Sequence, residues 1–152
     1  MAANVQEIIA WDGSYALGIE LIDNQHKELV RLINQLFQAC LLGNEAVEVM
    51  FKEAMGRMVE YVHYHFTAEQ QLLARVNYPN LAEHKKQHDI LIKNILEASK
   101  DHGGGKKFVP HNFVRTLRDW VLGHIAVSDK AYAAYIHEQK SKKLLTDKQI
   151  NG

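Results

Sequence analysis

Several imidazole side chains of this sequence stand at positions where the hydrophobic pattern predicts core residues. The chain has 152 residues and contains nine histidines. A single buried histidine is ordinarily hydrogen-bonded to a carbonyl or a hydroxyl group in the core. Five on one seam present too many donors and acceptors for that explanation, so together they favour a metal site. The five residues are His26, His65, His84, His88 and His124.

The spacing of these residues supports the same interpretation. His65 and Glu69 are four residues apart, and so are His84 and His88. In a helix this spacing places both side chains on one face, about one turn apart. One such pair arises readily by chance. Two pairs on consecutive predicted helices, with a single histidine on each remaining helix, are a much stronger indication.

Asp129 is a less obvious candidate for a further ligand. It follows His124 by five residues, which is about 140° round an ideal α-helix and roughly 7.5 Å further along it. Its position alone would suggest a solvated surface aspartate. However, five neutral imidazoles and one glutamate would leave two divalent ions badly under-neutralised. We therefore expect Asp129 to bridge the metals together with Glu69.

The types of donor atom indicate which metal is bound. Nitrogen and carboxylate oxygen without thiolate suit iron, manganese or zinc, and disfavour copper(I) and iron–sulfur clusters. Structural zinc is usually four-coordinate and often has cysteine ligands. Seven side chains exceed the needs of one ion but fit two ions that share bridging carboxylates. The predicted cofactor is a pair of non-haem iron ions.

Four segments of about 20 to 30 residues must position these side chains, a typical length for bundle helices. They are separated by turn-forming residues at 43–44, 77–80 and 103–110. Each segment carries an apolar seam with a period close to about 3.5. The predicted seam of the fourth is Phe113, Leu117, Trp120, Val127 and Ala131.

No segment alternates with period two over enough residues to predict a strand. The predicted fold is therefore all-α, an antiparallel up-down four-helix bundle spanning residues 21–137. Residues 1–20 show no sustained helical period and are expected to form an N-terminal arm packed on the bundle. For residues 138–152 we expect a short C-terminal extension of the helix or a tail.

Composition argues against several classes of partner. The 18 basic residues balance 18 acidic ones, so no overall field attracts nucleic acid or anionic lipid. No apolar run approaches the ~20 residues of a membrane span, and residues 1–10 do not resemble a signal peptide. Cys40 is the only cysteine, which suits a reducing compartment. We expect a cytoplasmic protein with no nucleic-acid partner and no membrane span.

From Trp11 to about Tyr135, the sequence resembles the hemerythrin family, specifically the single-domain bacteriohemerythrins. The resemblance rests on four motifs, which supply all seven ligand positions of the family in order. They are Asp23-Asn24-Gln25-His26, His65-Phe66-Thr67-Ala68-Glu69, His84 with His88, and Trp120-Val121-Leu122-Gly123-His124-Ile125 with Asp129.

The resemblance implies how the ligands are divided between the irons. His84, His88 and His124 would complete the protein ligands of one iron. His26 and His65 would hold the other, which keeps an open position for dioxygen. Glu69 and Asp129 would bridge the two irons, and an oxo or hydroxo group would complete the site.

The function implied is reversible dioxygen binding, as an oxygen carrier, store or sensor, without enzymatic turnover. The alternatives are a di-iron enzyme acting on peroxide or nitric oxide, an iron-handling protein, or a structural bundle with or without zinc. Leu29, Phe66 and Val121 lie beside or within a turn of the ligands and are expected to wall the oxygen pocket. Dioxygen is the predicted ligand, and the sequence does not identify a protein partner.

Two further residues carry expectations that the structure can test. Gln70 follows the ligand glutamate, at a position where bacterial members of the family often have a second glutamate. In a regular helix it points away from the seam, so we expect little effect on the metals. Tyr132 lies three residues after Asp129 and is expected either to donate a hydrogen bond to that carboxylate or simply to pack in the interior.

Overall fold

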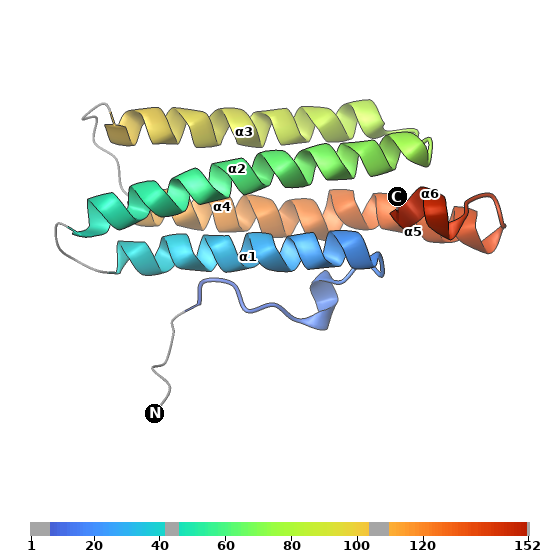
Figure 1. The fold of residues 1–152 in the computed structure, drawn as a ribbon, viewed down its shortest axis with the longest axis horizontal. Coiled ribbons are helices and arrows are strands. Elements are labelled where there is room, and N and C mark those ends of the chain that lie inside the picture. The colour runs from blue at the N-terminus through green and yellow to red at the C-terminus, as the bar shows by residue number, and fades with distance from the viewer. Residues whose placement is uncertain (1–6, 42–45, 104–109, 152) are drawn as a thin grey trace.

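Four long antiparallel helices form the body of the protein, as predicted (Figure 1). The computed structural model describes residues 7–41, 46–103 and 110–151, and its described part contains no strand. The predicted turn at 43–44 lies outside the described residues, as does the predicted turn at 103–110 except for its first and last residues, which end α3 and begin α4. The fourth helix is one continuous rod built of three segments. The elements are α1 (Glu20–Cys40), α2 (Ala46–Arg75), α3 (Leu81–Gly103), α4 (Pro110–His124), the π-helical η2 (Ile125–Asp129) and α5 (Lys130–Ser141).

The apolar seam of α1 is buried along its whole length, as predicted. Its members lie in two apolar clusters of the core, Ile22 in one and the other four in the second, and each fully buried aliphatic side chain contributes about 1.5–3 kcal/mol. The cysteine of this seam is hydrogen-bonded through Sγ to the carbonyl of Leu36 at 3.4 Å, and burial raises the pKa of its thiol to about 11. The seam comprises Ile22, Leu29, Ile33, Leu36 and Cys40.

The turn between α2 and α3 begins just after Arg75 and contains Asn77, which has a φ of 55°. The backbone N–H of Asn77 donates to the carbonyl of Ala74 at 3.2 Å, and that of Tyr78 donates to Leu73 at 2.9 Å. Asparagine tolerates this left-handed conformation better than most residues, and the two bonds satisfy helix-end carbonyls. The turn reverses the chain sharply and sets α3 beside α2, which aligns their histidines.

The segment that precedes α1 packs along the bundle through buried polar contacts. The side-chain oxygen of Asn34 accepts hydrogen bonds from the backbone N–H groups of Ile8 and Ile9, both at 3.0 Å. Its nitrogen donates to the carbonyl of Ile9 at 2.9 Å. These three bonds attach the segment to the middle of α1.

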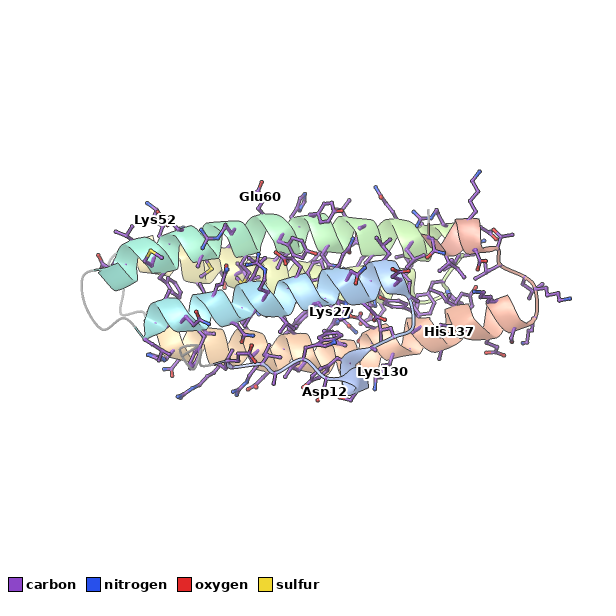
Figure 2. The ribbon with its side chains drawn as sticks, turned by 60° about the horizontal axis from the view of Figure 1, so that its bottom comes forward. Asp12, Lys27, Lys52, Glu60, Lys130 and His137 are labelled. Carbon is purple, nitrogen blue, oxygen red and sulfur yellow. The ribbon has the colours of Figure 1, made fainter. Side chains whose placement is uncertain are left out.

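A second attachment lies where the segment turns into α1. The carboxylate of Asp23 accepts from the backbone of Leu17 at 2.7 Å and of Gly18 at 3.1 Å. Nε2 of His137, on α5, donates to the carbonyl of Leu17 at 2.7 Å (Figure 2). Gly18 has a φ of +77°, and an added Cβ would lie 3.0 Å from the His137 ring, so this position requires glycine.

The end of the chain folds back onto the bundle through the short helix α6 (Asp147–Asn151). Ile150 is buried there, and Nε of Arg75 on α2 donates to the carbonyl of Gln149 at 3.1 Å. Within the described residues, no helix combines the length and the apolar character needed to cross a membrane.

The predicted seam of the fourth helix is wrong beyond Trp120. Val127 is 71% exposed and Ala131 is also exposed. The reason is η2, whose backbone hydrogen bonds join residues five apart, so that this turn contains one residue more than an α-helical turn. Every later residue is therefore rotated by about 100° from its predicted position. The residues buried on α5 are Tyr132, Ala133 and Ile136.

Candidate metal centre

The seven side chains predicted as ligands meet at one place in the bundle core. All four long helices contribute, and none of the seven is more than 9% exposed. The pairs spaced by one turn on α2 and α3 face each other, and the remaining ligands enter from α1 and from the junction of α4 with η2. The set is His26, His65, Glu69, His84, His88, His124 and Asp129.

The donor atoms form two groups that share one carboxylate. Glu69, His84, His88 and His124 offer ligand atoms that all lie within 4.8 Å of one another. His26, His65 and Glu69 form the second group under the same limit. The two groups therefore contain three and two histidines, with Glu69 between them.

Each of the two carboxylates turns a different oxygen toward each group. Oε1 of Glu69 lies 2.5 Å from Nε2 of His84 and 3.1 Å from that of His88. Oε2 lies 3.3 Å from Nε2 of His65. Asp129 repeats this arrangement, with Oδ1 lying 3.3 Å from Nε2 of His84. Its Oδ2 lies 3.2 Å from Nε2 of His26.

Asp129 reaches the centre because of the π-helical turn. In an α-helix it would lie about 140° away from His124. A turn closed by bonds between residues five apart brings the two onto one face, as an α-helical turn does for residues four apart. Oδ1 of Asp129 accordingly lies 3.1 Å from Nε2 of His124. Turns of this kind occur often at functional sites.

Charge in the centre is balanced between the carboxylates and the histidines. Burial opposes ionisation of Glu69 most strongly, but the four surrounding histidines hold its pKa well below the usual range. Burial likewise disfavours a charged His26 and a charged His84. The neighbouring Asp129 and Glu69 carboxylates favour the charged imidazoles more than burial opposes them, and they raise the pKa of each histidine to about 9.

Several polar atoms in this centre nevertheless lack a hydrogen-bond partner. Both nitrogens of His26 and both oxygens of Asp129 are buried and unsatisfied. Their short contacts do not have hydrogen-bond geometry, and burying such groups unpaired is costly. Ligands about 2.1 Å from one ion and at right angles lie about 3 Å apart, which is close to the spacing found here. The residues therefore fit a bound cation.

The raised histidine pKa values predict how the metal-free protein responds to pH. Since the folded pKa of His26 and His84 is about 9 and the ordinary pKa of histidine is 6.5, their contribution to stability is complete below about pH 6.5 and is lost as the pH rises through about 9. We expect the urea midpoint of the metal-free protein to fall over this interval, and less steeply in the His26→Gln variant. Equal slopes would contradict these assignments.

Two glutamines contact ligand histidines at Nδ1, the ring nitrogen that faces away from the centre. Oε1 of Gln25 lies 2.7 Å from Nδ1 of His65, a contact that the sequence interpretation missed. Nε2 of Gln70 lies 3.0 Å from Nδ1 of His88, so the expectation that Gln70 points away from the ligands is wrong. The side chain is long enough to reach across from α2 to α3, which the helical period alone does not reveal.

Tyr132 is fully buried and donates a hydrogen bond to Oε2 of Glu69 at 3.1 Å. The expectation was either a hydrogen bond to Asp129 or interior packing; Tyr132 is packed in the interior, but its hydrogen-bond partner is Glu69. Tyr132 thus reaches across the bundle from α5 to a residue of α2. This hydrogen bond holds the shared carboxylate in place.

Aromatic rings cover part of the centre. Phe66 stacks on His88 with ring centroids 3.6 Å apart and an interplanar angle of 2°. Trp120 stacks on His124 at 4.6 Å and 13°. Leu29 and Val121 are buried in the same apolar cluster as Phe66. The three residues expected to wall an oxygen pocket are thus buried in one cluster.

The other histidines that the structure describes lie outside the centre. His63 is exposed and His111 is half-buried, with its ring 6.1 Å from that of Phe37. His137 contacts the segment before α1. The side chain of His102 lies outside the described residues.

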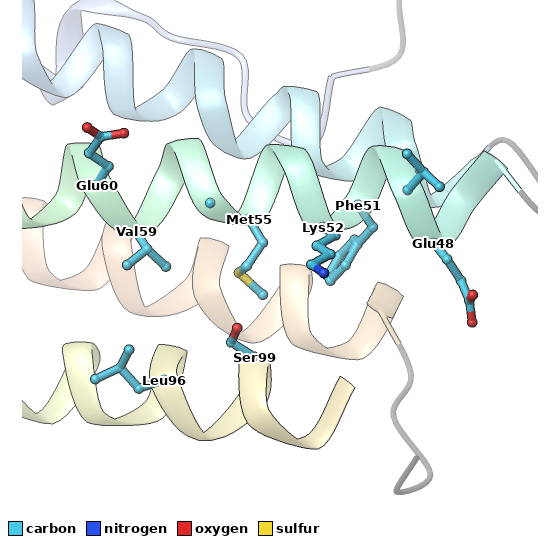
Figure 3. A pocket seen from close by; sticks show the side chains of 10 residues that line it. Glu48, Phe51, Lys52, Met55, Val59, Glu60, Leu96 and Ser99 are labelled. Carbon is cyan, nitrogen blue, oxygen red and sulfur yellow. The ribbon is translucent and has the colours of Figure 1, made fainter. Parts of the chain in front are cut away.

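A sizeable surface groove lies away from this centre. A groove of about 640 Å³ lies between α2 and α3, lined among others by Phe51, Met55, Val59 and Leu96 (Figure 3). A smaller hollow of about 350 Å³ reaches His124 beside Trp120.

Comparison with known proteins agrees with this geometry. The model of the hemerythrin HHE cation binding domain matches residues 17–136, which include all seven clustered side chains. This chain belongs to the hemerythrin family. Membership accounts for a helical bundle whose core concentrates histidines and carboxylates.

Several relatives within the hemerythrin family match most of the chain. The bacteriohemerythrin of Clostridium acetobutylicum is 33% identical over 135 residues, covering 82% of this chain and 98% of that protein. The hemerythrin-like protein of Naegleria gruberi is 30% identical, covering 87% and 97%. A crystal structure of wild-type hemerythrin superimposes with a TM-score of 0.77 at 26% identity, covering 84% of this chain and 96% of the other.

Proposed function

We propose that this hemerythrin-family protein holds two non-haem iron ions and binds dioxygen reversibly. The observation that carries the proposal is the unequal division of the histidines around shared carboxylates. One group has three imidazoles and the other has two. An ion in the second group has one protein ligand fewer, which leaves a position for a small exogenous ligand.

The proposed ligands follow from the two groups. His84, His88 and His124 hold one iron, and His26 and His65 hold the other. Glu69 and Asp129 bridge the pair, with an oxo or hydroxo group as the remaining bridge. When bound, the iron pair supplies the reversible electron exchange with dioxygen.

The protein's own side chains favour binding over oxygen–oxygen cleavage. Two carboxylates offset half of the four positive charges of a ferrous pair, and the remaining donors are neutral imidazoles. Ferritin-like di-iron bundles use more anionic donors, which stabilise more highly oxidised iron. Tyr132 orients Glu69, and the apolar cluster around Phe66 excludes water from the centre.

The test combines metal analysis with optical spectra. Protein purified without added metal is expected to contain about two irons per chain, and its spectrum should return to the deoxy form each time oxygen is removed. Irreversible oxidation on first exposure to air would overturn the proposal. Steady turnover of peroxide or nitric oxide with a reductant would favour the enzyme alternative, and zinc in place of iron a structural or metal-handling role.

Val121→Ala tests the proposed water-excluding wall. Val121 is 2% exposed and belongs to the apolar cluster beside the centre. Removing its two methyl groups opens space for water, so we expect autoxidation of the oxygenated protein to accelerate by about threefold or more. The rate is followed by absorbance in air. Val49→Ala, on the exposed side of α2, is the matched control, and equal rates in the two variants would remove Val121 from the wall.

A further inference from the structure

Two of the proposed ligand histidines have a glutamine at their outer nitrogen. The amide of Gln70 lies 3.0 Å from Nδ1 of His88, and that of Gln25 lies 2.7 Å from Nδ1 of His65. Both acceptors available to these imidazoles are therefore neutral.

The orientation of the Gln70 amide follows from the role of His88. Nε2 of His88 faces the centre, 3.1 Å from Oε1 of Glu69 and 3.1 Å from Nε2 of His124. With this nitrogen on a metal, Nδ1 carries the proton and must donate it. The amide oxygen of Gln70 then accepts, after a half-turn that exchanges two nearly isosteric atoms. Gln25 already presents its oxygen to His65.

A carboxylate at position 70 would act differently. An anionic acceptor draws the Nδ1 proton more strongly and makes the imidazole a better electron donor to the metal. It would also add a negative charge next to two buried carboxylates, since Gln70 directly follows Glu69. A more electron-rich, more negative centre stabilises oxidised iron relative to reduced iron. The amide avoids both effects.

We propose that Gln70 is a positioning residue that orients His88 with a neutral acceptor and thereby keeps the reduced metal pair resistant to loss of electrons. The inference rests on the proposed function for its meaning, because it concerns the stability of the oxygen-binding form. Its physical basis is the contact from α2 to His88 on α3. Phe66 stacks on the same ring, so His88 is held from its face and from its outer edge.

The experiment compares three variants with the unaltered protein. Gln70→Glu supplies the anionic acceptor, and Gln70→Leu removes the acceptor. Gln71→Glu adds the same charge at the next residue, whose side chain is exposed. The first readout is zinc affinity of the metal-free protein, measured by competition with a chromophoric chelator, which involves neither iron nor dioxygen. The second is the midpoint potential of the iron-loaded protein.

We expect Gln70→Glu to bind zinc about tenfold more tightly and Gln70→Leu about tenfold more weakly, with Gln71→Glu unchanged. Gln70→Glu should also lower the midpoint potential and speed autoxidation severalfold. Equal zinc affinity and equal potential in Gln70→Glu and Gln71→Glu would overturn the inference. Should Gln70→Glu fail to fold, unchanged zinc affinity in Gln70→Leu would overturn it as well.

Failure of this inference can be told apart from failure of the proposed function. If the unaltered protein cycles reversibly with dioxygen while Gln70→Glu behaves like Gln71→Glu, only the role of Gln70 is refuted. If the unaltered protein oxidises irreversibly, the oxygen-binding proposal fails. The zinc measurements still decide whether Gln70 acts through His88.

Discussion

Replacing Glu69 with glutamine is expected to empty the metal centre. Glu69 is fully buried and is the member common to both donor groups. Glutamine has nearly the same shape, but it carries no charge and presents an N–H donor where one carboxylate oxygen stood. Asp129 would then be the single anion for two divalent ions. Iron content should fall from about two per chain to below about half an iron per chain.

The matched control for this experiment is Glu60→Gln. Glu60 lies on the exposed face of the same helix (Figure 2), so it makes the same chemical change away from the centre. Both variants are purified in parallel and analysed for metal. Two irons retained by Glu69→Gln, with an unaltered spectrum, would show that Glu69 is not a bridge.

Deleting one exposed residue from the fourth helix is expected to be tolerated before Asp129 and to destabilise the protein after it. Deleting Val127 converts the π-helical turn into an α-helical one. His124 and the aspartate are then four residues apart and still share a face. The buried residues of α5 keep their register. The variant should therefore fold and retain its metals.

Deleting Ala134 has no such compensation. This residue is exposed in a regular part of α5, so its loss turns every later residue by about 100°. Ile136, which is fully buried, would leave the core, at a cost of about 3 kcal/mol or more. Urea unfolding of both deletions measures the contrast. Equal destabilisation by the two deletions would contradict the interpretation of the π-helical turn as a one-residue insertion.

The histidines of the centre were predictable because the helical period is a local property of the chain. Apolar residues recur at the same steps as His65, Glu69, His84 and His88, so their placement on inward faces needs no tertiary information. The same reasoning failed for Val127. The local hydrophobic pattern does not reveal that a π-helical turn adds a residue. After that turn, the helical period therefore assigns the wrong residues to the core.

By itself, the sequence determined the all-helical bundle and the concentration of imidazoles and carboxylates in its core. Only the tertiary structure decided how those groups meet: that each carboxylate faces both histidine groups, that Asp129 joins them through a π-helical turn, and that Gln70 and Tyr132 reach across to His88 and Glu69. The physical reason is that whether a side chain faces the core depends on the pattern of residues along its own helix. Contacts between helices depend on side-chain length and on the register of one helix against another, which residues far apart in the chain set together.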